Sequence, residues 1–128
     1  MNNRLCCLLV LLASPVVAEP VDNCATVLGS LAVELRIARA LPMSRSTSFV
    51  CPRERQTQAL LGASKQRILN SLGPPDATGP STAGTGGTEW SYYFTAAHSG
   101  PPAPGVPQLG FVFDEQPQLI SVHCQRTR

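Results

Sequence analysis

Glycine and proline are concentrated in the second half of the chain, and they limit which regular elements can form there. Between Gly73 and Gly110, 8 glycines and 7 prolines occur among 38 residues. Proline lacks a backbone N–H and glycine favours turns, so neither residue type continues a helix through this stretch. Residues 79–87 and 97–107 are therefore expected to be loops. Only short strands fit between and after them.

Three segments show the alternation of apolar and polar residues that is typical of half-buried strands. They are residues 89–95, 108–114 and 119–124. The side chains expected on the buried face are Trp90, Tyr92, Phe94, Leu109, Phe111, Phe113, Ile120, Val122 and Cys124. The side chains expected on the opposite face are Ser91, Tyr93, Thr95, Leu119, Ser121 and His123. Five residues separate Phe113 from Leu119, so the last two segments are expected to form a hairpin.

Helices are expected only before the strands. Over residues 21–41 an apolar stripe of helical spacing follows Asp22, a good N-terminal cap, and Pro42 ends the pattern. A second helix is expected over residues 65–72, between a Ser64 cap and Gly73, which is followed by two prolines. A short helix or turn is expected in the charged stretch that follows Cys51. The stripe residues of the first helix are Cys24, Leu28, Leu31, Leu35 and Ala38.

This order of elements predicts an α+β fold. Helices pack on one face of a three-stranded antiparallel sheet in the order α-α-β-β-β, with an extra helix in front, and the other face of the sheet stays partly exposed. The expected division is a helix and connector over residues 19–50, a domain over residues 51–124, and a polar tail over residues 125–128.

The first 18 residues have the pattern of a cleaved secretory signal peptide. Arg4 precedes an apolar run of nine residues, and Val16 and Ala18 are small residues at the cleavage site. The run is shorter than the roughly 20 residues of a membrane span. Neither Cys6, Cys7 nor Cys24 stands where a lipid anchor requires it. We therefore expect a soluble periplasmic protein without a lipid anchor.

Composition and motifs indicate no enzyme and no cofactor. The net charge is +2, with 10 basic and 8 acidic residues and no basic stripe, which argues against nucleic-acid binding. His123 and Cys124 are neighbours on a strand and point to opposite faces, so they are poorly placed to share a metal ion. His98 lies in a Pro/Gly-rich loop without a patterned partner, and the glycines of residues 84–87 lack the rest of a phosphate-binding loop.

The segment LGASKQRILNSLGPPD (residues 61–76), Trp90-Ser91-Tyr92 and Phe113-Asp114 resemble the SmpA/OmlA (BamE-like) domain family. That family has a helix of the form G-x-[ST]-x-x-x-V-x-x-x-L-G-x-P, a W-x-Y strand and an F-D strand. The resemblance covers residues 58–124. It implies a noncatalytic protein-binding module of the Gram-negative envelope, with β-barrel assembly components among its partners. The chain departs from the family in lacking a lipidation cysteine and in having Pro117 in its last hairpin.

Cleavage of the signal peptide leaves Cys24, Cys51 and Cys124, which allow one disulfide in an oxidising compartment. Cys51 and Cys124 flank the region of family resemblance. We therefore predict a Cys51–Cys124 disulfide that ties the ends of this domain, with Cys24–Cys51 as the alternative. In the first case Cys24 is expected to be a buried apolar residue.

The expected function is protein binding in the cell envelope. The contact residues are expected on the open face of the sheet and in the proline-rich loop over residues 100–107. On the sheet face they are Tyr93, Leu119, Ser121 and His123. An alternative function is inhibition of an enzyme by the same face, because secreted β-lactamase inhibitors have a similar shape. A third alternative is a periplasmic protein that handles a metal or small molecule.

Overall fold

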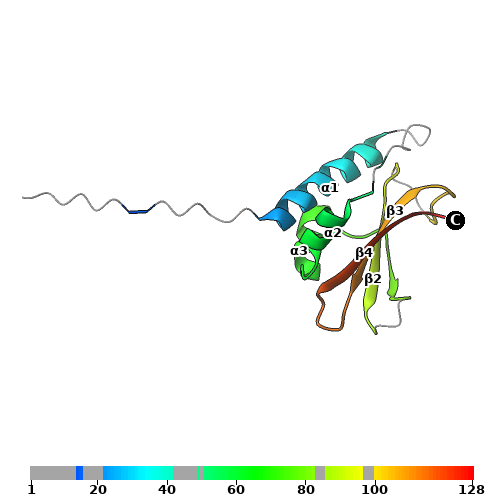
Figure 1. Ribbon diagram of the computed structural model, residues 1–128. Helices are drawn as coiled ribbons and strands as arrows, with labels where there is room; N and C mark the ends of the chain where they lie inside the picture. Colours follow the sequence, from blue (N-terminus) through cyan, green and yellow to red (C-terminus); the bar gives the residue numbers. More distant parts are fainter. Residues whose placement is uncertain (1–13, 16–21, 42–48, 50, 83–85, 97–99) are drawn as a thin grey trace, which may run out of the picture.

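The structure is a computed structural model that describes residues 14–15, 22–41, 49, 51–82, 86–96 and 100–128 (Figure 1). The predicted signal peptide lies outside the described residues except for Ser14 and Pro15. Three helices, α1 (Asn23–Ala40), α2 (Glu54–Leu60) and α3 (Lys65–Leu72), precede four strands. The strands are β1 (Ala77–Pro80), β2 (Thr88–Tyr93), β3 (Pro107–Phe113) and β4 (Leu119–Arg126).

The strands form one antiparallel sheet in the order β1-β2-β3-β4, and the helices pack against one of its faces (Figure 1). The α+β class predicted from the sequence is therefore confirmed. None of the helices in the described part of the chain is long and apolar enough to cross a membrane.

Local capping signals set the helix boundaries, as the sequence predicts. The Asp22 side chain accepts a hydrogen bond from the Ala25 N–H at 3.1 Å, and the Ser64 hydroxyl accepts one from the Arg67 N–H at 3.1 Å. Gly73 ends α3 with a φ of 77°, a conformation that side chains disfavour. Arg67 also pairs with Asp22. The Ala25 N–H, followed by Arg67, lowers the pKa of the Asp22 carboxyl.

The core lies between the helices and the inner face of the sheet. Rings from neighbouring strands meet edge to face, with centroid distances of 5.5 Å between Tyr92 and Phe111 and 5.0 Å between Trp90 and Phe113. The buried residues that form this core are Leu28, Leu31, Leu35, Leu60, Ala63, Ile68, Leu72, Tyr92, Phe94, Leu109, Phe111, Phe113 and Leu119. The helix stripe and the inner faces of the first two predicted strands are thus confirmed.

The sheet has four strands, so the prediction of three is wrong. Residues 77–80, which overlap the expected loop, form β1 and pair with β2 from Ala77 opposite Ser91 to Pro80 opposite Thr88. The hydrogen-bond alternation places the Pro80 nitrogen on the free edge, where no N–H is needed. A strand that is so short and contains proline has no sequence signature of its own, and its pairing with β2 defines it.

A β-bulge at Ile120 reverses the predicted facing at the start of β4. Phe113 lies opposite Leu119, but Val112 lies opposite Ser121, so Ile120 has no partner on β3. Leu119 is 1% exposed and belongs to the core, whereas Ile120 is 40% exposed. The predictions that Leu119 lies on the open face and that Ile120 is buried are therefore wrong, because one inserted residue moves its neighbours to the other face.

The polar end of the chain continues the sheet instead of forming a separate tail. β4 runs through Arg126, beyond the Cys124 at which the strand was predicted to end. The Thr127 N–H then donates to the Val106 carbonyl at 2.9 Å, and the Thr127 hydroxyl donates to the Ala103 carbonyl at 2.7 Å. These bonds hold the loop before β3 against the end of β4.

Cys51 and Cys124 form a disulfide, with their Cα atoms 5.8 Å apart. This is the predicted pairing, and the alternative Cys24–Cys51 does not occur. The bond joins the segment that leads into α2 to the middle of β4 across a sequence separation of 73 residues. Cys24 is free and packs against the core, and its burial raises the pKa of the thiol.

Ionisation of Tyr92 is expected to lower the free energy of unfolding at alkaline pH. Its buried hydroxyl donates to the Gly73 carbonyl at 2.9 Å, and burial, followed by the negative charge of Asp76, raises its pKa. In the unfolded chain, tyrosine has a pKa of about 10. The stabilisation is therefore complete below that pH and falls as the pH rises above it, because the unfolded state loses its proton first.

We expect Tyr92→Phe to lower the free energy of unfolding by about 1 kcal/mol at neutral pH, since one hydrogen bond is lost. Between about pH 9 and 11 the variant should lose less stability than the wild type, because Tyr92 no longer ionises. Urea unfolding at a series of pH values measures both effects. If the free energy of unfolding falls equally with pH in the wild type and the variant, Tyr92 does not cause the decline.

Candidate functional site

The candidate site is the face of the sheet opposite the helices, which no described helix covers (Figure 1). The strand register identifies the residues on this face, because side chains alternate along each strand. They are Ala77 and Gly79 of β1, Glu89, Ser91 and Tyr93 of β2, Gln108, Gly110 and Val112 of β3, and Ser121, His123 and Gln125 of β4.

A hydrogen bond between two side chains crosses the middle of this face. The His123 Nε2 lies 2.6 Å from the Glu89 Oε1. His123 belongs to β4 and Glu89 to β2, so the contact spans the strand between them, β3. A carboxylate only accepts, so the imidazole N–H is the donor. The Glu89 side chain is 15% exposed and the His123 side chain 37% exposed. The imidazole is thus held in place while part of it remains open to a partner.

Gly110 makes this pair possible. It lies on β3 directly opposite His123, and a Cβ atom there would come within 2.2 Å of the His123 Cε1 and 2.8 Å of the Glu89 Oε1. Any side chain at this position would therefore push the pair aside. The glycine leaves a shallow gap over the central strand, and the two polar side chains fill it.

The structure brings some of the predicted contact residues together on this face. Ser121 is exposed and His123 is half-buried, two residues apart on β4. Tyr93 lies at the end of β2, where its backbone N–H donates to the Asp76 carboxylate at 2.7 Å. Leu119, by contrast, belongs to the core.

The sequence prediction missed Glu89. The available signal was its spacing, because Glu89 shares the alternation of Ser91 and Tyr93 on the polar side of the same strand. Its pairing with His123 depends on the register of three strands, which alternation within one strand does not reveal.

A hollow of about 650 Å³ opens where β3 starts and β4 ends. Residues from the open face, from the proline-rich loop and from the turn after β1 line it together. They are Thr82, Pro101, Pro102, Gln108, Gln125, Arg126, Thr127 and Arg128. The hollow therefore joins the two regions in which contacts are expected, and it combines proline rings, amide groups and two cationic side chains.

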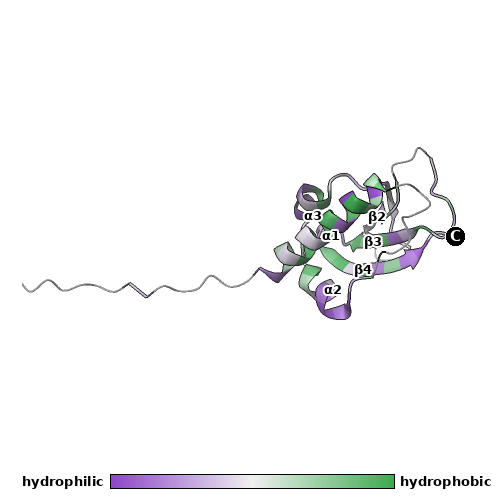
Figure 2. Cartoon of the chain, turned by 90° about the horizontal axis from the view of Figure 1, so that it is seen from above, coloured by the Kyte–Doolittle hydropathy of each residue, from purple (hydrophilic) through white to green (hydrophobic). Residues whose placement is uncertain are grey.

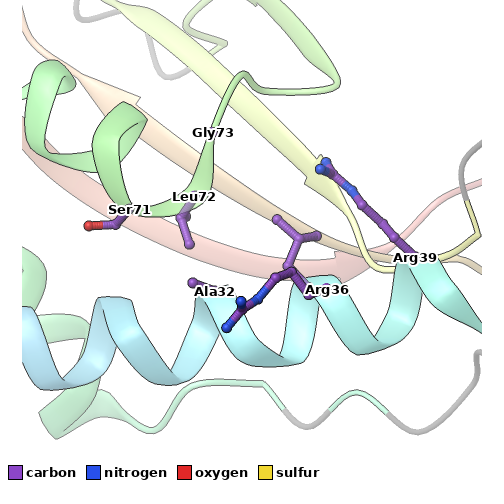
Figure 3. A pocket seen from close by; sticks show the side chains of 7 residues that line it. Ala32, Arg36, Arg39, Ser71, Leu72 and Gly73 are labelled. Carbon is purple, nitrogen blue, oxygen red and sulfur yellow. The ribbon is translucent and has the colours of Figure 1, made fainter.

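A second hollow, of about 350 Å³, lies between α1 and α3 (Figure 3). Figure 3 shows Arg36 beside Ala32 and Arg39 extending toward the sheet. The Arg39 guanidinium binds the Asp76 carboxylate at 3.1 Å, so it ties α1 to the segment before β1. Cations near the end of α3 complement the negative end of its dipole. Arg39 therefore has a structural role, and this hollow is the weaker candidate.

The open face offers hydrogen-bond donors and acceptors and few groups for metal binding. Glu89 and His123 supply two potential ligands, and within the described residues no group of three His, Cys, Asp or Glu side chains could hold a metal ion. Ser121, Gln125 and the half-exposed imidazole can bond to the polar groups of another macromolecule.

Comparison of the chain with protein-family models, curated proteins and solved structures gave no match. Its function must therefore be inferred from the open face, the hollow and the disulfide.

We expect Gly110→Ala to lower the free energy of unfolding by about 1–3 kcal/mol, since the added methyl group overpacks the site under His123 and Glu89. The same substitution in a His123→Ala background should cost much less, because the nearest obstructing atoms are gone. Urea unfolding of the four proteins in this cycle measures the coupling. Equal costs in both backgrounds would rule out the clash as the cause.

Proposed function

We propose that this chain is an exported, soluble and noncatalytic protein-binding module of the bacterial envelope. The predicted signal peptide and the Cys51–Cys124 disulfide both suit an oxidising compartment outside the cytoplasm. The resemblance to the SmpA/OmlA family supports a role beside outer-membrane assembly, with β-barrel assembly components as the expected partners. Binding takes place on the open face of the sheet.

The hollow at the start of β3 and the end of β4 is the observation that carries this proposal. Its walls come from parts of the chain with different chemistry: the proline-rich loop, the turn after β1, the start of β3 and the end of β4. Protein interfaces commonly combine apolar contacts with polar groups that supply hydrogen bonds, and arginine is enriched in them. The hollow has this composition, and the Glu89–His123 pair and Ser121 extend the polar surface along the sheet.

Site-specific photo-cross-linking in the native periplasm tests the proposal. A photoreactive residue at Ser121 places the probe on the open face, and one at Val33, which is 45% exposed on α1, is the matched control. We expect envelope proteins, and β-barrel assembly components among them, to be cross-linked from position 121 and not from position 33. A single soluble enzyme at position 121 would instead indicate the inhibitor function. Cross-links from position 33 alone, or none from either position, would contradict binding by this face.

A further inference from the structure

One edge of the sheet, the outer side of β4, is open in its middle. At the start of β4 the Leu119 carbonyl accepts from the Gly62 N–H at 2.8 Å, and the Leu119 N–H donates to the Ala63 carbonyl at 2.8 Å. The outward groups of Leu119 are thus bonded to the loop between α2 and α3. Past the end of β4, the Thr127 N–H donates inward to the Val106 carbonyl.

The alternation between these two ends identifies the outward groups in the middle. In an antiparallel pair, successive residues point their N–H and C=O alternately toward the partner strand and away from it. Ser121, His123 and Gln125 therefore bond to β3, and Val122 and Cys124 point their backbone groups outward. Within the described part of the chain, no backbone or side-chain group bonds to these four atoms.

The opposite edge of the sheet is protected against further pairing. β1 has only four residues, and Pro80 presents no N–H. Short edge strands and prolines are devices by which proteins prevent unwanted strand addition. β4 has eight residues and contains no proline or lysine, and its bulge lies near its first residue, before the open part. The molecule thus blocks one edge and leaves the other available.

Arginines outnumber acidic residues near the open edge. Arg126 and Arg128 follow Cys124 and line the hollow, and the disulfide brings the start of α2, with Arg53 and Arg55, beside β4. Figure 2 shows hydrophilic residues both on α2 and at the end of β4. Two acidic residues also lie here: Glu54 in the first turn of α2, and Glu34 of α1, which lines a small hollow with Pro52 and Gln56. An acidic segment would be attracted here, and the positive edge of a second copy would be repelled.

We propose that the open edge of β4 binds an extended acidic segment of the partner protein as an additional strand. The backbone of that segment bonds to the N–H and C=O groups of Val122 and Cys124, and its acidic side chains contact Arg126 and Arg128. Exposed Leu61 and Ile120, 46% and 40% exposed, offer an apolar contact near the start of the strand. The inference rests on the proposed function only in that the partner is a protein.

Amide hydrogen exchange measured by NMR tests this inference directly. The probe is an eight-residue peptide of alternating threonine and glutamate, and the matched control peptide alternates threonine and lysine. The acidic peptide should slow exchange of the Val122 and Cys124 amides by about tenfold or more. The amides of Ser121 and His123, which already bond to β3, serve as internal controls and should change little.

Two variants separate the backbone contribution from the charge contribution. Val122→Pro removes an outward N–H and leaves the bonds to β3 intact, so it should abolish the effect of the peptide at Cys124, whereas Val122→Thr should retain it. Arg128→Gln should weaken binding of the acidic peptide and reduce its salt dependence. This second variant tests the inference even if the proline variant does not fold.

Several results would overturn the inference. One is the absence of protection up to about 1 mM acidic peptide. Equal protection by the lysine peptide is another. Protection that grows with protein concentration alone would mean that the edge pairs with a second copy. If position 121 still cross-links to envelope proteins while the edge stays unprotected, the proposed function stands and only the strand addition is wrong.

Discussion

Replacing both Cys51 and Cys124 with alanine is expected to lower the free energy of unfolding by about 4 kcal/mol. The disulfide closes a loop over a sequence separation of 73 residues, and the bond restricts the unfolded chain strongly because this loop is long. Domains of this size are typically stable by about 5–15 kcal/mol, so the loss is a large part of the total. Urea unfolding of the oxidised wild type and the double variant measures it.

Cys24→Ala is the matched control for the disulfide variant. Cys24 is partly buried and unpaired, and its replacement removes one sulfur without opening a loop, so the expected cost is below about 1.5 kcal/mol. Treating the wild type with a reductant should reproduce the loss seen in the double variant. If oxidised and reduced wild type unfold at the same urea concentration, the disulfide contributes nothing to stability.

Leu119→Ala and Ile120→Ala are expected to differ by several kcal/mol although the two residues are adjacent. The Leu119 side chain is 1% exposed, and its removal leaves a cavity in the core that costs about 2–5 kcal/mol. Ile120 sits on the bulge and is 40% exposed, so its truncation should cost less than about 1 kcal/mol. Urea unfolding of both variants makes the comparison.

This pair of variants tests the bulge itself. Simple alternation along residues 119–124 predicts the reverse order, with Ile120 buried beside Val122 and Leu119 exposed beside Ser121. A larger loss for Ile120→Ala than for Leu119→Ala would therefore exclude the register of β4 described here. The same register places the Val122 and Cys124 amides on the open edge, so the proposed strand addition depends on this result.

Local signals in the sequence correctly predict several elements of the fold. The start of α1 at Asp22 and the limits of α3 at Ser64 and Gly73 follow from capping groups within one helical turn. The inner faces of β2 and β3 follow from alternation within each strand. The expected helices cover one face of the sheet, and the Cys51–Cys124 pairing follows from where the two cysteines flank the domain.

The candidate site was predicted in part. Ser121 and His123 do share the open face, and the proline-rich loop does meet the ends of the strands at the hollow. Glu89 was missed and Leu119 was misplaced. Both errors concern the register between strands, which depends on contacts between residues far apart in the sequence.

The class of the fold, the helix boundaries and the polar and apolar faces of two strands can be predicted from the sequence, because each depends on neighbours only a few residues away. The other features depend on contacts between residues far apart in the sequence. β1 is a strand because β2 pairs with it, and the bulge accommodates Leu119, whose outward backbone groups bond to Gly62 and Ala63. The Glu89–His123 pair and the open edge follow from that register, which only the packing of the whole chain specifies.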